Sequence, residues 1–477
     1  MTYLYIKPPM NEYRTVPLHL FQTWHSKQLP PLMYQCVTQL KQANPEFTHH
    51  LYDDDMCRTF IQDHFPGVLH TYDTLIPGAY KADLWRYCIL YVYGGIYLDI
   101  KYKCVHPFKL IELTTKEQYV CDREYAGVEG VYQALMVCYP KNPILYTCIQ
   151  KIVSYVNQND YGKSCLFMGP HLVGSFFTKV ELHNFPMKFT GTGILRQGKL
   201  ILTTYPEYRR ELKQFSTKKH YSELWLQRSI YSYRKLLPFS VEVIPVEATS
   251  ACISKGTVYT LNKGKNYSMT YGTEWGIPVL LPHSYTQMYL YVYNDLLYFV
   301  GLKNNRVWSG VYPNGSMIRP TFHTSSVPEI LWCMGTWNHE LCIVYTWYPL
   351  QIGRIEKNTL TIHTVHYHVP PFFKELYTAY SSVPWKDQQW VVLVKPTCYV
   401  WNEKPSIKHE YIFVILNEMM EVVKYSEFFI VEGMISHLSI DERGIEMCTT
   451  LGKCSIAMYS WNTLHELTWT YNESLCS

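Results

Sequence analysis

Four charged side chains follow one another in an order that could build a ligand site. Asp83 and Arg86 are three residues apart in a segment with helical apolar spacing, so they lie on one helix surface. The pair Gly94–Gly95 then ends the helix, and a short apolar run delivers Asp99 and, two residues later, Lys101. By itself an Asp–Arg pair at this spacing favours an exposed ion pair, worth about 0.3–0.5 kcal/mol, over a ligand site. The order of the elements is what places these polar groups near one strand end.

The first half of the chain alternates helix and strand patterns. Strands are predicted over 18–24, 47–53 and 96–100, and helices over 32–43, 54–65 and 79–93. Such alternation is typical of an α/β fold with a mostly parallel sheet. Ligands of such sheets bind beyond the carboxyl ends of the strands, which is where Asp99 falls.

After about residue 240 the helical periodicity nearly disappears and short β-rich runs recur, separated by turn signals. Strand–turn–strand units repeat every 50–60 residues or so, which favours an all-β domain of small sheets. A β-propeller of four to six blades is the preferred architecture, and a β-sandwich is the competitor. The chain is therefore expected to hold two domains, an α/β domain over 1–240 and an all-β module over 241–477.

Composition narrows the function classes. The chain has 477 residues and a formal net charge of +4, which is small for this size and argues against a dedicated nucleic-acid binder. No signal peptide and no apolar run of 18 residues is found, so a protein of the cytoplasm without a membrane span is expected. The 15 cysteines lack metal-ligand spacings, which predicts reduced and mostly buried thiols.

The stretch "KADLWRYCILYVYGGIYLDIKY" resembles the core motif of glycosyltransferases with a D-x-D sugar-binding region, and most of all glycosyltransferase family 32. That family contains yeast initiating mannosyltransferases and α-1,4-galactosyltransferases, with clostridial glucosylating toxins as distant relatives. Further segments agree in order, namely "VPLHLFQTW" (16–24), "NPEFTHHLYDDD" (44–55), "MGPHLVG" (168–174) and "HYSELW" (220–225). The spelling "GGIYLDIKY" also resembles homologues encoded by large DNA viruses, which would place the protein in host cytoplasm or virion.

The resemblance implies a GT-A fold and transfer of a sugar from a UDP- or GDP-linked donor to a glycan or protein acceptor, with retention of anomeric configuration. It implies that Asp83 and Arg86 hold the donor sugar and that Asp99 contacts ribose and a metal ion. The remaining donor-side residues would be Trp24 on the nucleobase, His220 and Trp225 over the diphosphate, and Gln22, Tyr80, Gly94 and Gly95 beside them. Weaker correspondences place Gln133 and His171 near the acceptor or in an active-site loop.

Lys101 is the departure from the family pattern, because it stands where the second Asp of D-x-D belongs. Negative charge builds on the leaving β-phosphate, and Mn²⁺ or Mg²⁺ usually stabilises it. Three interpretations remain open. The metal is retained by Asp99, His220, diphosphate oxygens and water; or Lys101 replaces it as a fixed cation; or the site is catalytically dead.

The last interpretation leads to a rival class, a sugar-nucleotide- or glycan-binding protein with a decayed transferase domain. The module over 241–477 could bind the acceptor or mediate a homodimer in either case. The only literal D-x-D of the first half, Asp53–Asp55, opens a helix, so capping and the helix dipole explain it better than catalysis.

Overall fold

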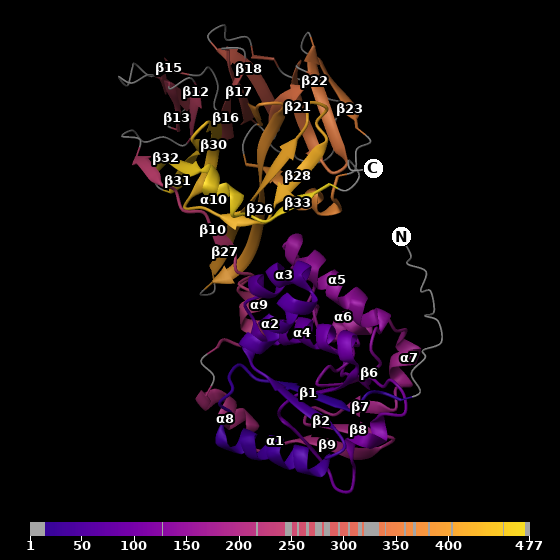
Figure 1. The fold of residues 1–477 in the computed structure, drawn as a ribbon. Helices are drawn as coiled ribbons and strands as arrows, with labels where there is room; N and C mark the ends of the chain where they lie inside the picture. Colours follow the sequence, from indigo (N-terminus) through magenta and orange to yellow (C-terminus); the bar gives the residue numbers. More distant parts are fainter. Residues whose placement is uncertain are drawn as a thin grey trace. The chain divides into compact units, whose positions relative to one another are not determined.

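In the computed structural model the chain divides into two compact units, which Figure 1 colours by sequence. Unit 1 comprises Met1–Ser232 with Tyr399–Lys404, and unit 2 comprises Tyr233–Cys398 with Pro405–Ser477. The structure describes residues 15–243 except 126 and 216–217, the strands between 250 and 318, and residues 333–472 except 339, 357–358, 366–368, 380–381, 402–403 and 452.

The centre of unit 1 is a four-stranded sheet of order β2-β1-β3-β6. Its strands are β1 (His19–Thr23), β2 (Thr48–Tyr52), β3 (Gly95–Leu98) and β6 (Leu135–Cys138). The first three strands run parallel and β6 is antiparallel to β3. Every residue of β3 is buried, as expected for a strand covered on both faces. The predicted α/β class with a mostly parallel sheet is confirmed.

Helices cover both faces of this sheet, with α1 and α8 on one side and α2 to α5 on the other (Figure 1). The helices of unit 1 are α1 (Pro31–Ala43), α2 (Asp54–His64), α3 (Leu69–Thr74), α4 (Gly78–Tyr93), α5 (Pro143–Asn157), α6 (Pro170–Gly174), α7 (Lys179–His183), α8 (Tyr208–Phe215) and α9 (Tyr221–Leu226). The side chain of Asp53 accepts a hydrogen bond from Met56 N and caps α2, so the acidic triplet begins a helix as predicted.

A second sheet of order β4-β9-β8-β7-β5 completes unit 1. Its strands are β4 (Tyr102–Cys104), β5 (Val120–Cys121), β7 (Met187–Phe189), β8 (Gly193–Arg196) and β9 (Lys199–Thr204). One apolar core joins the two sheets and includes Ile96, Leu98 and Tyr102 from either side of Asp99. The backbone that carries Asp99 and Lys101 is therefore anchored in the core at both ends.

One carboxylate fixes α8 to α1, a helix that lies far from it in the sequence. Glu211 is 5% exposed and accepts hydrogen bonds from the backbone N–H groups of Leu32 and Met33, at 2.9 and 3.0 Å. The Tyr205 hydroxyl donates to the same carboxylate at 2.8 Å. Since α1 has no side-chain cap of its own, Glu211 satisfies its first free N–H groups and meets the positive end of its dipole.

Unit 2 is β-rich, as predicted, and is built from several separate sheets. Three consecutive sheets contain β12 (Ser250–Ser254), β13 (Thr257–Lys263), β14 (Tyr267–Tyr271) and β15 (Val279–Leu280); β16 (Gln287–Tyr293), β17 (Leu296–Lys303), β18 (Arg306–Tyr312) and β19 (Met317–Ile318); and β20 (Cys333–Trp337), β21 (Glu340–Trp347), β22 (Leu350–Glu356) and β23 (Thr359–Thr364). Each is an antiparallel meander, since every strand pairs with the next one in sequence.

Two further sheets complete unit 2. The larger contains β10 (Arg234–Lys235), β24 (Tyr377–Thr378), β25 (Val383–Trp385), β26 (Gln388–Trp401), β27 (Lys404–Leu416), β28 (Val422–Ser426), β29 (Phe429–Ile430) and β33 (Trp469–Tyr471). The last contains β30 (Met434–Asp441), β31 (Gly444–Leu451), β32 (Lys453–Ser460) and, beside β32, the early strand β11 (Ser240–Val243), and α10 (Trp461–His465) follows it. Strands from the start and the end of the unit thus share one sheet.

Two expectations from composition can be compared with the described residues. Every cysteine among them is a free thiol, and all but Cys104 and Cys398 are buried. None of the helices in the described part of the chain combines the length and the apolar character that crossing a bilayer requires.

Candidate active site

A cleft of about 770 Å³ lies in unit 1 at the carboxyl ends of β1 and β3. Thr23 and Trp24 line it from the end of β1, and Asp99 and Lys101 line it from the segment after β3. Residues of α2, α3, α4, α8 and the segment that leads into α9 form the other walls. The cleft therefore occupies the position where open α/β sheets bind their ligands.

Asp99 follows β3 directly and begins a tight turn. Its N–H donates to the carbonyl of Ala134 at 2.8 Å, and its own carbonyl accepts from Tyr102 N at 3.1 Å. Because β3 ends at Leu98 and β4 begins at Tyr102, the turn has no freedom to slide along the sheet. The sequence placed Asp99 at the end of this strand correctly.

The Asp99 carboxylate accepts two hydrogen bonds and lies near a third side chain, which is cationic. Tyr97 donates its hydroxyl proton to Oδ1 at 2.9 Å, and Lys101 Nζ donates to Oδ2 at 2.7 Å. Arg86 Nη2 lies 4.0 Å from Oδ1 on the side of α4. The Asp99 and Lys101 side chains are 24% and 20% exposed, so this ion pair faces the cleft.

Arg86 connects the acidic groups of the site and is itself almost fully buried. Its guanidinium lies 3.4 Å from Asp83 Oδ1 and donates to the carbonyls of Ala82 and Gln133 at 3.2 and 3.0 Å. It also stacks over the ring of Tyr97, with 4.3 Å to the ring centroid. The spacing alone suggests an exposed i,i+3 ion pair. In the structure the pair is buried, and its guanidinium also donates to two backbone carbonyls.

Burial and charge set the ionisation of these groups. Burial opposes the charge of Asp99, but the cations Lys101 and Arg86 outweigh it and hold its pKa below the usual range. Burial likewise opposes the charge of Lys101, and Asp99 nevertheless raises its pKa. For Asp83 burial dominates over Arg86 and raises the pKa to about 6. Asp99 and Lys101 are therefore a stable ion pair at neutral pH, whereas Asp83 is close to titration.

Asp83 should make the stability of the protein depend on pH. Its folded pKa of about 6 exceeds its ordinary value of 3.8, so the folded state keeps a proton that the unfolded chain releases between these values. Stability from this group is therefore lost as pH rises from about 4 to 6, by roughly 1–3 kcal/mol. Chemical denaturation of the wild type and of Asp83→Asn is measured at pH 4, 5, 6 and 7. The free energy of unfolding of the variant should rise relative to that of the wild type as the pH rises from 4 to 6.

A control is Gln39→Ala, which changes an exposed side chain of α1 that has no titratable group. Its difference from the wild type should stay flat over the same pH range. A flat difference for Asp83→Asn as well would contradict the raised pKa of Asp83.

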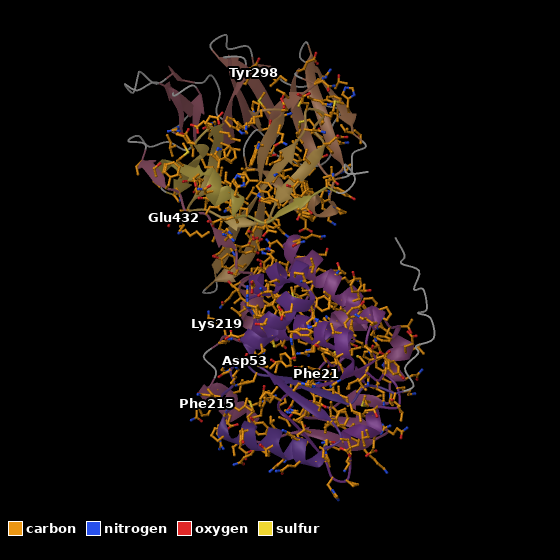
Figure 2. The ribbon with its side chains drawn as sticks, viewed as in Figure 1. Phe21, Asp53, Phe215, Lys219, Tyr298 and Glu432 are labelled. Carbon is orange, nitrogen blue, oxygen red and sulfur yellow. The ribbon has the colours of Figure 1, made fainter. Side chains whose placement is uncertain are left out.

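Cations dominate the cleft. Seven of the described lining residues are Lys or Arg, and two are carboxylates, Asp54 and Asp99. Beyond Arg86 and Lys101 the cations are Lys81, Arg209, Lys213, Lys218 and Lys219. We call these five residues the basic rim. Lys218 pairs with Asp54 at 2.8 Å, and Lys219 lies 3.5 Å from Glu223. Figure 2 labels Lys219 and Asp53, the neighbour of Asp54, on this side of unit 1. The rim suits an anionic ligand.

Three predicted donor-side residues lie along β1 and α4, and only Trp24 lines the cleft. The ring of Trp24 packs against that of His25, with 4.6 Å between centroids. Gln22 is fully buried and shares a hydrogen bond with His49 at 2.8 Å. Tyr80 is buried and donates its hydroxyl proton to the carbonyl of Cys165 at 2.9 Å. Gln22 and Tyr80 thus support the walls around the cleft.

The glycine pair is placed by the packing of the sheet. Gly94 has φ +64° and ends α4, and Gly95 has φ +110° and begins β3. A Cβ on Gly95 would lie 2.6 Å from the carbonyl oxygen of His19, and one on Gly94 would lie 2.6 Å from Cδ of Pro140. Neither glycine belongs to the described cleft lining. Both let α4 and β3 pass close to neighbouring backbone.

His220 and Trp225, at the start of α9 and within it, have different surroundings. His220 lines the cleft, and its Nδ1 is 2.6 Å from the Ser222 hydroxyl and accepts from Ser222 N. Trp225 donates its indole N–H to the carbonyl of Tyr161 at 2.6 Å, with Arg228 stacked over its ring. Trp225 is absent from the described lining, so His220 is the member of this pair that faces the cleft.

Gln133 is buried next to Arg86, whereas His171 is half-buried in α6. Gln133 is 2% exposed and hydrogen bonds with the Tyr87 hydroxyl, and its Oε1 has no partner among the described residues. His171 Nδ1 lies 2.8 Å from the Ser164 hydroxyl. Gly169, in the same segment, packs so closely on Asp83 that a Cβ there would lie 2.7 Å from Oδ2. This segment covers the side of Asp83 that faces away from Arg86.

The expected metal can be tested against the donors around Asp99. Each carboxylate oxygen already has a donor within 2.9 Å, and one donor is an ammonium. A divalent ion on Oδ2 would lie roughly 4 Å from Lys101 Nζ, where repulsion is about 8 kcal/mol at an effective dielectric of about 20. The described residues contain no cluster of three or more His, Cys, Asp and Glu ligands. The residues present do not fit a divalent ion on Asp99.

Sequence reasoning missed the basic rim and Tyr97. Tyr97 lies two residues before Asp99 in β3, and this period-2 spacing could have indicated a shared strand face. The rim residues of α8 carry no such signal, because their place over the cleft depends on the contact of Glu211 with α1.

The fold and the site define an α/β unit with an ion-paired centre under a basic cleft at the strand ends. Comparison with known proteins agrees with this class. Residues 30–120 match the family described as "Glycosyltransferase sugar-binding region containing DXD motif". The chain is 33% identical over 94 residues to inositol phosphoceramide mannosyltransferase 3 of Schizosaccharomyces pombe. The aligned segment covers 20% of this chain and 26% of the relative.

Two other relatives show the same pattern. The initiation-specific α-1,6-mannosyltransferase of Candida albicans is 29% identical over 99 residues, 19% of this chain and 26% of the relative. An uncharacterized glycosyltransferase of Acanthamoeba polyphaga mimivirus is 33% identical over 92 residues, 19% of this chain and 37% of the relative. The chain spans about a quarter of the length of each of these two fungal relatives. Residues 30–120 are similar to a glycosyltransferase sugar-binding region, with Lys101 in place of the second Asp of its D-x-D motif, and the predicted resemblance to family 32 is confirmed.

Proposed function

We propose that this protein is a retaining glycosyltransferase that moves a sugar from a UDP- or GDP-linked donor to a glycan or protein acceptor. The observation that carries the proposal is the ion-paired centre of Asp99, Lys101 and Arg86 on the wall of a basic cleft at the end of β3. Retention of configuration rests on the resemblance to family 32.

The charge of the cleft supports a nucleoside diphosphate. Arg86 and Lys101 are paired with Asp83 and Asp99, and Lys218 is paired with Asp54. Two of the other rim cations, Arg209 and Lys213, belong to α8, where they can neutralise two phosphate groups. A neutral sugar alone would leave the positive charge of the cleft without a counter-charge.

The base is best placed at the end of β1. Trp24 lines the cleft there and offers an aromatic side chain. A nucleobase can stack on such a ring. The donor sugar would then lie toward Asp99 and Arg86, with the diphosphate under the rim.

The chemistry needs no protein nucleophile. In front-face transfer the bond between the sugar carbon and the donor phosphate breaks, and the acceptor hydroxyl attacks from the same face. Its proton passes to an oxygen of the leaving phosphate. The described side chains would then hold the donor in place, exclude water and stabilise the charge that develops on the phosphate.

For unit 2 we propose a five-bladed propeller that binds the acceptor or a second copy of the chain. Five sheets support this architecture. The early strand β11 pairs with the late strand β32, and such a pairing of first and last strands would close a ring of blades. The cytoplasmic location and the viral origin stay predictions.

The proposal predicts binding and slow hydrolysis of a nucleotide sugar. A thermal-shift screen of GDP-mannose and several UDP-sugars, each with EDTA or with Mn²⁺, should raise the melting temperature for one base only. GDP-mannose comes first, because the relatives are named as mannosyltransferases. Asp99→Ala should abolish hydrolysis of the donor that binds.

The rival class, a decayed transferase that only binds, gives a different result. It predicts a thermal shift with one donor but no hydrolysis with or without Mn²⁺. No shift and no turnover with any nucleotide sugar would contradict both proposals.

A further inference from the structure

We propose that Lys101 replaces the divalent metal ion in this site, so that its ammonium is the fixed cation beside the β-phosphate of the donor. The inference rests on the proposed function and deepens it. It makes Lys101 a catalytic residue and makes nucleotide binding independent of Mn²⁺ and Mg²⁺.

The position of the ammonium carries the argument. Lys101 Nζ lies 2.7 Å from Asp99 Oδ2, where an ion bound by that carboxylate would otherwise be. An ammonium has three N–H donors, and Asp99 accepts one of them. The side chain lines the cleft, so the remaining donors can reach a ligand there.

The surroundings of Lys101 hold this cation in place. The rings of Tyr102 and Tyr132 lie beside Nζ, with 5.4 and 5.7 Å to their centroids, and their hydroxyls hydrogen bond to each other at 2.8 Å. The backbone carbonyl of Lys101 accepts from Tyr205 N at 3.1 Å, next to the start of α8. A cation fixed before the ligand arrives needs no reorganisation when negative charge develops.

The reaction remains balanced with a lysine in this role. The electron pair of the breaking sugar–phosphate bond moves to the phosphate oxygen, and the acceptor oxygen forms the new bond to the sugar carbon. The acceptor proton moves to the leaving phosphate. Lys101 keeps its own protons and donates a hydrogen bond to the phosphate, as Lys residues do in other phosphate sites.

Nucleotide binding tests this inference without an acceptor. Isothermal titration of the full chain is done with UDP and with GDP, once in EDTA and once in Mn²⁺. Only one of the two nucleotides should bind, and its Kd in EDTA should agree with its Kd in Mn²⁺ within about threefold. Lys101→Met should weaken that binding in EDTA by about 10–100-fold, as expected for loss of a hydrogen bond from a charged group. Lys103→Met, two residues along in β4 and absent from the described lining, should leave it unchanged.

Lys101→Asp is the second variant, because it restores the D-x-D spacing with Asp99. Its nucleotide binding should require Mn²⁺. Thermal unfolding of each variant shows whether the fold is intact. Wild-type binding that needs Mn²⁺, or unchanged binding by Lys101→Met in EDTA, would overturn this inference and leave the proposed function standing. Binding of neither nucleotide in either condition would overturn both.

Discussion

Replacing Arg86 with methionine should lower the free energy of unfolding by about 3–5 kcal/mol and abolish nucleotide binding. The substitution would leave the carboxylates of Asp83 and Asp99 without the cation between them. Two backbone carbonyls would also lose a donor, and the stack on Tyr97 would lose its charge. Breaking a buried ion pair from one side costs this much because the remaining charge stays buried without a partner.

Urea denaturation measures the loss in the free energy of unfolding, and hydrogen exchange of α4 peptides shows whether the loss is located in α4. Arg58→Met is the matched control, because Arg58 pairs with Asp73 at 2.7 Å with both side chains at least 40% exposed. That variant should lose far less stability than Arg86→Met, because solvent screens this exposed pair. Asp83→Asn in the Arg86→Met background should recover part of the loss, since it removes one of the stranded charges. Equal losses for the two Arg variants would show that the Arg86 cluster is not structural.

Replacing Gly95 with alanine should destabilise unit 1 by about 3 kcal/mol or more. The φ of +110° is a conformation that a residue with a side chain rarely adopts, and the new Cβ would lie 2.6 Å from the backbone oxygen of His19. Since β1 and β3 pair at this point, relief of the clash must separate the two strands that deliver Trp24 and Asp99. Donor binding should fall together with stability.

Gly67→Ala is the control for this change, because an added Cβ there would meet no atom within 4 Å. It should change the free energy of unfolding by less than about 1 kcal/mol. Circular dichroism and denaturation of both variants make the comparison. A Gly95→Ala protein as stable as Gly67→Ala would mean that the strands tolerate the side chain.

Local signals predicted most of the elements in unit 1. The helix predicted over 79–93 is α4 (Gly78–Tyr93), and the one predicted over 54–65 is α2 (Asp54–His64). Periodicity, a capping Asp53 and the glycine stop act within a few residues, so their consequences can be foreseen from sequence. The strand predicted over 96–100 ends two residues earlier, because the chain turns at Asp99 to begin β4 at Tyr102.

The second half was less predictable, because its strands pair over long separations. The β-rich character was visible in the sequence, but the pairing of β11 with β32 joins residues more than 200 positions apart. No local pattern encodes such a partner.

By itself the sequence determined that Asp83, Arg86 and Asp99 gather at one strand end and that Lys101 stands where a second carboxylate is expected. Only the tertiary structure decided how these charges pair. It placed Lys101 on Asp99, buried Arg86 between two carboxylates and, through the contact of Glu211 with α1, brought α8 and its cations over the cleft. The physical reason is that ion pairing depends on distance and burial, and both are set by packing between segments far apart in the chain.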